Sequence, residues 1–188
     1  MAREIQPGFA LWITGLPASG KSMVTAALVE QLKKHGVSAT VLESDLLRKA
    51  FSTQPSYDEQ GREYFYGSLA FIGQILTERG INVIFDATAN RQSYRDRARR
   101  RIPRFIEIHV DTPLDVCIQR DPKGIYRKGK AGLSQTVPGL QAEYEPPPHP
   151  DLVIHGDREN PQAAAERIVK LLEERGMAQT ASAEGKLK

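Results

Sequence analysis

The sequence predicts one three-layer α/β domain, in which a mostly parallel sheet is flanked by helices. Short apolar runs alternate with stretches of helical periodicity along most of the 188 residues, and strands that alternate with helices form parallel sheets. A glycine-rich turn joins the first apolar run to the first helical stretch. The length fits a single domain with its own core, because domains cluster at about 100–150 residues.

The elements follow one another in a regular order. Each apolar run is followed by a glycine or an acidic residue, and the helices carry apolar positions four residues apart, as Val24, Leu28 and Leu32 do. Strands are predicted at 9–14, 37–42, 81–85, 105–110 and 151–155, and helices at 23–34, 61–79, 92–101, 113–120 and 161–175.

Two segments interrupt the alternation. Residues 121–150 are rich in Gly, Pro, Lys and Arg, and they predict an active-site loop that is called the lid below. Residues 177–188 are small and polar and predict a disordered tail. A single domain is therefore expected over residues 1–176.

Composition narrows the class of protein. No run of about 18 apolar residues occurs and the first residues lack the pattern of a signal peptide, so we expect no membrane association and a cytoplasmic location. The single Cys117 is interpreted as a buried side chain. Basic residues cluster at 95–101 and 127–130. The first cluster is interpreted as a solvated helix face. No aromatic residues interleave with the two clusters, so nucleic acid is not the expected partner.

The turn after the first strand carries a phosphate-binding motif, GxxxxGK[ST], in the strand-to-helix context that it requires. Its glycines let successive backbone N–H groups point at a phosphate, at the positive end of the helix. Its lysine neutralises the β- and γ-phosphates of the nucleotide, and its serine hydroxyl is a ligand of Mg²⁺. These features predict a P-loop NTPase fold that binds a nucleoside triphosphate and Mg²⁺. The loop alone leaves GTPases, ATPases and transport motors open, and the residues at the ends of the other strands favour ATP as the cofactor. The predicted nucleotide-binding residues are Gly15, Leu16, Pro17, Ala18, Ser19, Gly20, Lys21 and Ser22.

Beyond this motif, the chain resembles the adenylylsulfate kinase family from about Gly8 to Leu152. The matching blocks, in that family's order and spacing, are GLPASGKS at 15–22, ESDLLR at 43–48, the stretch 57–62, DTPLDVCIQRDPKGIYRKGKAG at 111–132 and GLQAEYEPPPHPDL at 139–152. The resemblance implies that Asp45 binds the metal, contacts the substrate and accepts the proton of the attacking hydroxyl. Its place after the second strand independently favours a site, because ligands bind beyond the carboxyl ends of parallel strands. Capping of the following helix is the structural alternative.

The resemblance also assigns residues to the acceptor. Arg48 and Arg62 match arginines that hold its charged groups, and Tyr57 matches an aromatic residue that stacks on its adenine. Arginine suits this task because its planar fork makes paired hydrogen bonds to oxyanions. Exposed helix arginines and a surface tyrosine are the bland alternatives.

The basic residues of the lid, with Arg120 immediately before it, predict a mobile flap that brings positive charge over the phosphates and excludes water. Arg120 is assigned to the nucleotide and Lys123 to the substrate, and a solvated basic loop is the alternative. The cluster comprises Arg120, Lys123, Arg127, Lys128 and Lys130.

Departures from the family pattern concentrate on the acceptor side. They include Phe65, residues 88–90 and residues 135–138, where Val137 cannot stack on adenine as an aromatic ring would. The string IFDATANR at 84–91 instead resembles P-loop kinases that act on polynucleotide ends, sugars or other hydroxyl compounds. There a strand-end aspartate orders Mg²⁺, so Asp86 either shares the metal with Asp45 or closes the strand as an Asx turn.

Together these observations predict an ATP-dependent kinase that phosphorylates the 3′-hydroxyl of adenylylsulfate, with Lys21, Asp45 and Asp86 as catalytic residues. One alternative is a kinase of another nucleotide-linked or small hydroxyl acceptor. The other is a non-catalytic nucleotide-binding partner of a sulfate-activating enzyme. The family resemblance further implies a homodimer and a place in sulfate assimilation.

Overall fold

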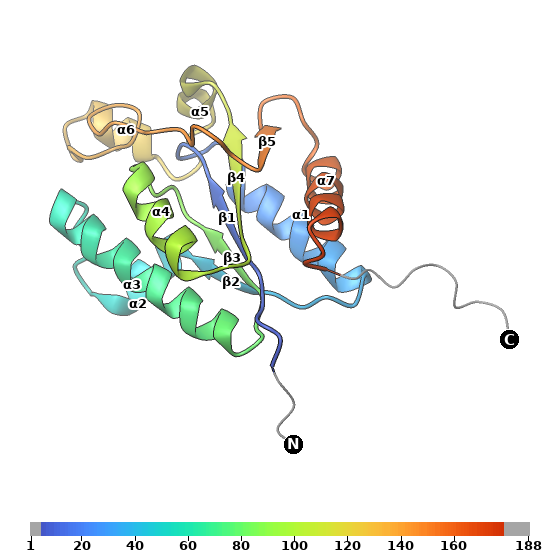
Figure 1. The fold of residues 1–188 in the computed structure, drawn as a ribbon. Helices are drawn as coiled ribbons and strands as arrows, with labels where there is room; N and C mark the ends of the chain where they lie inside the picture. Colours follow the sequence, from blue (N-terminus) through green and yellow to red (C-terminus); the bar gives the residue numbers. More distant parts are fainter. Residues whose placement is uncertain (1–4, 179–188) are drawn as a thin grey trace, which may run out of the picture.

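The computed structural model describes residues 5–178 and centres on a sheet of five parallel strands. The strand order is β2-β3-β1-β4-β5, so the strand that leads into the phosphate loop lies in the middle (Figure 1). The strands are β1 (Ala10–Thr14), β2 (Thr40–Glu43), β3 (Val83–Asp86), β4 (Phe105–Asp111) and β5 (Leu152–His155). The expected three-layer α/β fold is confirmed.

Helices cover both faces of the sheet (Figure 1). Along β1, Leu11 and Ile13 pack on one side and Ala10 and Trp12 on the other, because successive side chains of a strand point to opposite faces. Both sets are fully buried, as expected for a central parallel strand. Helices α1 (Lys21–Lys34) and α7 (Pro161–Glu174) cover the first face, and α3 (Glu59–Glu78) and α4 (Gln92–Arg101) cover the second.

The remaining helices lie near the carboxyl ends of the strands. Helix α2 (Ser44–Phe51) follows β2 directly, and α5 (Leu114–Arg120) and α6 (Ile125–Lys130) lie above the sheet (Figure 1). Helix α6 belongs to the segment that the sequence suggested as a loop. Its inward residues, Tyr126 and Gly129, are buried, while its cations are exposed. The lid therefore contains a short amphipathic helix.

Four helices end in the same way. A glycine with positive φ follows the last turn, and the N–H of the next, apolar residue donates to a carbonyl five residues earlier. This Schellman arrangement satisfies carbonyls that a helix end leaves unpaired. The glycine and apolar pairs are Gly36-Val37 after α1, Gly80-Ile81 after α3, Gly132-Leu133 after α6 and Gly176-Met177 after α7.

The last described residues belong to the domain. Met177 packs against the core and Ala178 is buried in it, while the rest of the expected tail, 179–188, lies outside the described residues. Within the part of the chain that the structure describes, no helix combines the length and apolarity needed to cross a bilayer.

One residue of the basic run 95–101 is not where the sequence suggested. Arg95 is completely buried and forms an ion pair with Glu107 on β4, with 2.6 Å between Nε and Oε1. The interpretation as a solvated face is wrong for this residue, because its partner comes from a strand that the sequence cannot pair with it. Arg99, Arg100 and Arg101 are exposed, as expected.

Candidate active site

The phosphate loop, residues 15–22, connects β1 to α1 at the carboxyl edge of the sheet. Gly15 and Gly20 have φ angles of 155° and 107°, which side chains with a Cβ rarely adopt. A Cβ at Gly15 would also lie 2.5 Å from the carbonyl oxygen of Val110. Both glycines are therefore required by the path of the loop, and Ser22 is exposed at its end.

Lys21 points back across this loop. Its Nζ donates to the carbonyl oxygens of Gly15 and Leu16, at 3.1 and 2.8 Å. Burial lowers the pKa of Lys21 below its ordinary value, and the nearby carboxylates of Asp86 and Asp45 oppose that shift. An anionic partner strongly stabilises the charged form of a buried ammonium that is held by carbonyls, and nucleotide phosphates are such a partner.

Two candidate carboxylates lie beside the loop. Asp86 ends β3, where it is in register with Ile13 of β1 and Glu43 of β2, and it is almost fully buried. Asp45 lies in the first turn of α2, immediately after β2. The fold thus brings together Lys21, Asp45 and Asp86, as the sequence suggested.

A lid residue reaches the same place. Lys123 Nζ lies 2.5 Å from Asp45 Oδ2, and this hydrogen bond raises the pKa of the Lys123 ammonium. Both side chains are about half exposed, so solvent still reaches this ion pair.

Arg48 lies in a cage of aromatic rings. Its guanidinium carbon is 3.8 Å from the ring centroid of Phe65, 4.9 Å from that of Tyr57 and 5.3 Å from that of Tyr66. Nη1 donates to the carbonyl of Ser56 at 3.1 Å, whereas Nη2 is buried and has no hydrogen-bond partner within residues 5–178. Arg48 is 5 % exposed, so it is not the exposed helix arginine of the bland alternative.

Arg62 is buried as well, and it is held by three segments. Its Nε donates to the carbonyl of Tyr57 at 2.8 Å, Nη1 to Asn90 Oδ1 at 3.0 Å, and Nη2 to the carbonyl of Thr136 at 2.6 Å. Tyr57, whose backbone carbonyl accepts one of these bonds, is itself 45 % exposed.

The lid is attached to the phosphate loop. The hydroxyl of Tyr126 donates to the carbonyl of Pro17 at 3.0 Å, and Tyr126 packs with Cys117, Val137 and Leu16. Val137 is 2 % exposed, so its side chain anchors the lid instead of facing an adenine. Cys117 is buried, as expected.

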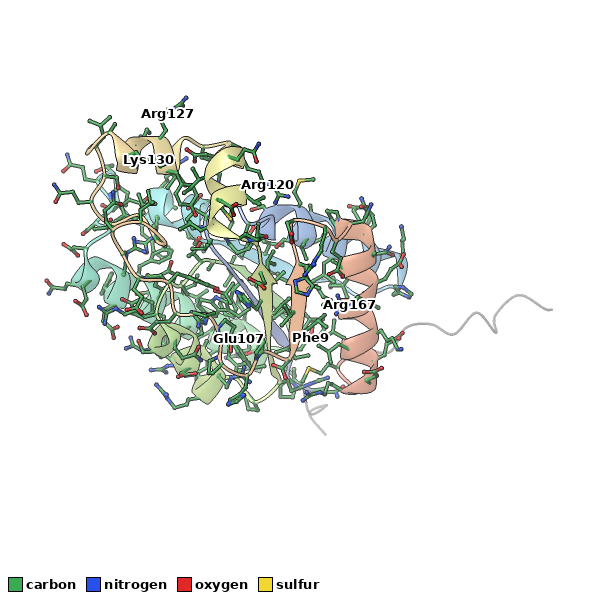
Figure 2. The ribbon with its side chains drawn as sticks, turned by 90° about the horizontal axis from the view of Figure 1, so that it is seen from above. Phe9, Glu107, Arg120, Arg127, Lys130 and Arg167 are labelled. Atoms are coloured by element: carbon green, nitrogen blue, oxygen red, sulfur yellow. The ribbon has the colours of Figure 1, made fainter. Side chains whose placement is uncertain are left out.

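Besides Lys123, the basic residues from 120 to 130 lie in two different places. Arg120, at the end of α5, donates to the carbonyl of Gly156 at 2.9 Å. A Cβ at Gly156 would come within 2.3 Å of the Ser19 carbonyl, which places Arg120 beside the phosphate loop. Arg127 and Lys130 lie exposed on α6, at the edge of the molecule (Figure 2).

The donor set suits Mg²⁺. Residues 5–178 contain no group of three or more His, Cys, Asp and Glu side chains arranged to hold a metal ion. Magnesium does not need one, because it keeps several waters and binds through one or two carboxylates and the phosphates of its substrate. The exposed Ser22 hydroxyl and the carboxylates of Asp45 and Asp86 meet that requirement.

Several residues that make contacts in this site were not identified from the sequence. Thr112 donates to the Ser19 carbonyl at 2.8 Å, Tyr126 to that of Pro17, and Asn90 bonds Arg62. Each contact joins residues at least 28 positions apart. Local pattern carries no signal for such pairs.

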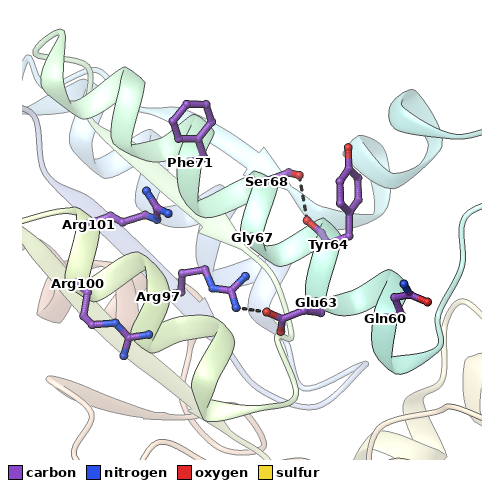
Figure 3. Close-up of a pocket in the computed structure, with 9 residues that line it drawn as sticks. All are labelled: Gln60, Glu63, Tyr64, Gly67, Ser68, Phe71, Arg97, Arg100 and Arg101. Atoms are coloured by element: carbon purple, nitrogen blue, oxygen red, sulfur yellow. Dashed lines mark hydrogen bonds and ion pairs between the residues drawn. The ribbon is translucent and has the colours of Figure 1, made fainter.

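A shallow groove between α3 and α4 lies apart from these residues (Figure 3). Arg97 pairs there with Glu63, and the Ser68 hydroxyl donates to the Tyr64 carbonyl at 2.9 Å. None of the candidate site residues lines it. Its lining residues are Gln60, Glu63, Tyr64, Gly67, Ser68, Phe71, Arg97, Arg100 and Arg101.

Comparison with known proteins agrees with this geometry. The family model described as adenylylsulphate kinase matches residues 7–155. An adenylyl-sulfate kinase of Synechococcus sp. (strain JA-2-3B'a(2-13)) is 34 % identical over 169 residues, which cover 90 % of this chain and 97 % of the relative. One of Rippkaea orientalis is 33 % identical over 171 residues, with 91 % and 94 % covered.

Solved structures point the same way. The structure of the Mycobacterium tuberculosis APS kinase CysC, in complex with AMPPNP and APS, is similar with a TM-score of 0.84 at 32 % identity, covering 89 % of this chain and 98 % of that one. A sugar kinase from Janibacter sp. HTCC2649 reaches a TM-score of 0.66 at 20 % identity, with 92 % and 99 % covered, and shares the fold alone. On the family model, the curated relatives and the similar structures, the chain belongs to the adenylylsulfate kinase family.

Proposed function

We propose that this chain transfers the γ-phosphoryl group of ATP to the 3′-hydroxyl of adenylylsulfate. The observation that carries the proposal is Arg48, whose buried Nη2 has no hydrogen-bond partner in the part of the chain that the structure describes. An unsatisfied buried guanidinium N–H is costly, and an anionic acceptor relieves that cost. Adenylylsulfate brings an anionic phosphosulfate group, whereas a neutral sugar offers only hydroxyl oxygens and no negative charge to pair with the guanidinium.

On the nucleotide side, the backbone N–H groups of residues 15–20 and the Lys21 ammonium bind the β- and γ-phosphates. Ser22, Asp45 and Asp86 are the residues that would hold Mg²⁺. When bound, this ion supplies positive charge that neutralises the phosphates. Arg120 lies beside the loop and adds a second cation on the ATP side. Positioning and charge stabilisation account for most catalysis in phosphoryl transfer, which suits this set of residues.

Asp45 is the proposed general base. Lys123 donates to Oδ2, so Oδ1 remains available to accept the proton of the acceptor hydroxyl. Lys123 also keeps the carboxylate in place from the lid side, which ties base positioning to lid closure. The proton leaves the 3′-oxygen for Asp45 as that oxygen bonds to phosphorus and ADP departs.

The acceptor occupies the side of Arg48 and Arg62. Within the described residues, three of the five N–H groups of Arg62 donate to protein acceptors, which leaves two to bind the acceptor's charged groups. The half-exposed Tyr57 ring is positioned at the same side to stack on adenine. Self-association as a homodimer stays a prediction from the family resemblance.

The test is turnover of adenylylsulfate by purified protein with Mg-ATP, with the 3′-phosphorylated product separated by chromatography. Lys21→Ala should lower kcat/KM by about a hundredfold or more, since it removes a group that stabilises the transferring charge. Lys33→Ala is the matched control, because this exposed lysine lies at the far end of the same helix. A panel of nucleosides, sugars and 5′-hydroxyl oligonucleotides runs in parallel. Turnover of one of these, with none of adenylylsulfate, would overturn the proposal.

A further inference from the structure

The turn after β3, residues 87–91, is held in an unusual conformation. Ala89 is buried and has a φ of 39°, which is uncommon for a residue other than glycine and persists only where surrounding contacts enforce it. The Ala89 N–H donates to the Tyr66 hydroxyl at 3.1 Å, and the Thr14 hydroxyl donates to the Thr88 carbonyl at 2.6 Å. The next residue, Asn90, is thereby turned into the protein and is 5 % exposed.

Asn90 connects two separate parts of the site. Its Oδ1 accepts from Arg62 Nη1 at 3.0 Å, and its Nδ2 donates to the Glu143 carbonyl at 2.9 Å. Its backbone carbonyl accepts from the Glu145 N–H at 2.7 Å. One side is therefore an acceptor-binding arginine, and the other is the segment by which the chain returns from the lid.

Among the hydrogen-bond acceptors of Arg62 in residues 5–178, only Asn90 contributes a side chain. The Tyr57 and Thr136 partners are backbone carbonyls, which no substitution removes. Asn90 is thus the position at which the sequence can change the orientation of this guanidinium while the backbone stays the same.

From this geometry we infer that Asn90 is a positioning residue, which orients Arg62 toward the acceptor and couples that arginine to the lid segment 136–145. The inference rests on the proposed function, because it needs Arg62 to bind the acceptor. Affinity for the acceptor then depends on Asn90, while affinity for ATP, which is bound on the other side of the site, does not.

The experiment compares Asn90→Ala with Asn82→Ala, its matched control. Asn82 also makes two side-chain hydrogen bonds, with the Phe9 N–H and the Ser38 carbonyl, but at the opposite end of β3. Asn90→Ala should raise the KM for adenylylsulfate by about tenfold or more, because the charged Arg62 loses a hydrogen bond, and leave the KM for ATP within about twofold. Asn82→Ala should leave both constants near their wild-type values.

Two further variants separate positioning from a general loss of structure. Asn90→Asp keeps an oxygen that accepts from Arg62, so the KM for adenylylsulfate should recover most of the way to wild type. In an Arg62→Ala background, Asn90→Ala should have little further effect on that KM, since the residue on which it acts is gone.

Three results would overturn the inference. Asn90→Ala could leave both KM values near wild type, as Asn82→Ala does, or it could raise the KM for ATP together with that for adenylylsulfate. The third is that Asn90→Ala raises the KM for adenylylsulfate as much in the Arg62→Ala background as in wild type. If Asn90→Ala does not fold, Asn90→Asp carries the test, and a KM for adenylylsulfate tenfold above wild type refutes the inference. Wild-type protein that does not act on adenylylsulfate at all would refute the proposed function, and the inference with it.

Discussion

The buried ion pair between Arg95 and Glu107 offers the most direct test of how this fold is held together. Arg95 Nε lies 2.6 Å from Glu107 Oε1, and its other nitrogens donate to the Ala89 and Glu145 carbonyls and to the Gln92 side chain. Glu107 is 1 % exposed. Replacing Arg95 with methionine therefore leaves a buried carboxylate and two backbone carbonyls without this partner.

The expected loss of stability follows from these contacts. Removal of one partner of a buried ion pair costs about 3–5 kcal/mol, because the remaining charge stays desolvated. Arg99 also donates to Glu107 Oε2, at 2.9 Å, which favours the lower part of that range. For a chain of this length, the melting temperature should fall by roughly 2–4 °C per kcal/mol.

Urea unfolding measured by tryptophan fluorescence is the assay, since the single Trp12 lies fully buried in β1 and reports on the core. Arg100→Met is the control, because Arg100 is exposed on the same helix and should change stability by less than about 0.5 kcal/mol. The double variant Arg95→Met/Glu107→Leu should be more stable than Arg95→Met alone, since it removes the stranded charge. A loss below about 1 kcal/mol for Arg95→Met, or a double variant less stable than the single one, would refute the reasoning.

Two further predictions concern the acceptor side and the response to acid. Phe65→Asn, which restores the family's residue type, should raise the KM for adenylylsulfate and cost about 3 kcal/mol of stability, because it removes a buried ring that stacks under Arg48. Steady-state kinetics measure the KM, and urea unfolding measures the stability. A lower KM would contradict the role of that stack. Burial lowers the pKa of His109 in the folded protein below its ordinary 6.5. The unfolded chain therefore binds this proton more tightly than the folded one, and stability is lost as the pH falls below 6.5. In urea titrations at pH 7.5 and 5.5, His109→Gln should lose less stability than wild type, and equal losses would show that His109 does not contribute.

The order of elements was predictable because strands and helices in this fold carry strong local signals. The first and fourth strands were expected at 9–14 and 105–110, and the structure has Ala10–Thr14 and Phe105–Asp111. The second and third strands begin later than expected. Val37 and Ile81, the first apolar residues after Gly36 and Gly80, close the preceding helices instead of opening the strands.

Helix α6 was missed although a signal for it exists. Six residues are too few for apolar periodicity to show, and two of its positions carry lysine and one glycine. However, Gly132-Leu133 repeats the glycine and apolar pair that ends α1, α3 and α7. Recognising that pair as a helix end would have placed a helix in the lid.

The two halves of the site differ in how far sequence can specify them. The proposed ATP side consists of one contiguous loop and of residues at adjacent strand ends, so a motif and a strand order locate it. The proposed acceptor side depends on contacts such as those of Arg62 with Asn90 and Thr136, which lie 28 and 74 residues away.

The residues that depart from the family pattern show why this difference matters. Phe65 and Val137 suggest a damaged acceptor pocket when they are aligned with family positions one at a time. In the structure, Phe65 packs beneath Arg48, and Val137 joins the cluster that attaches the lid to the phosphate loop. Each therefore acts through a neighbour that only the fold supplies. A variant that restores a single family residue removes this packing, but it does not introduce the neighbouring residues that the family residue packs against. If the chain binds adenylylsulfate, such a variant should therefore weaken acceptor binding.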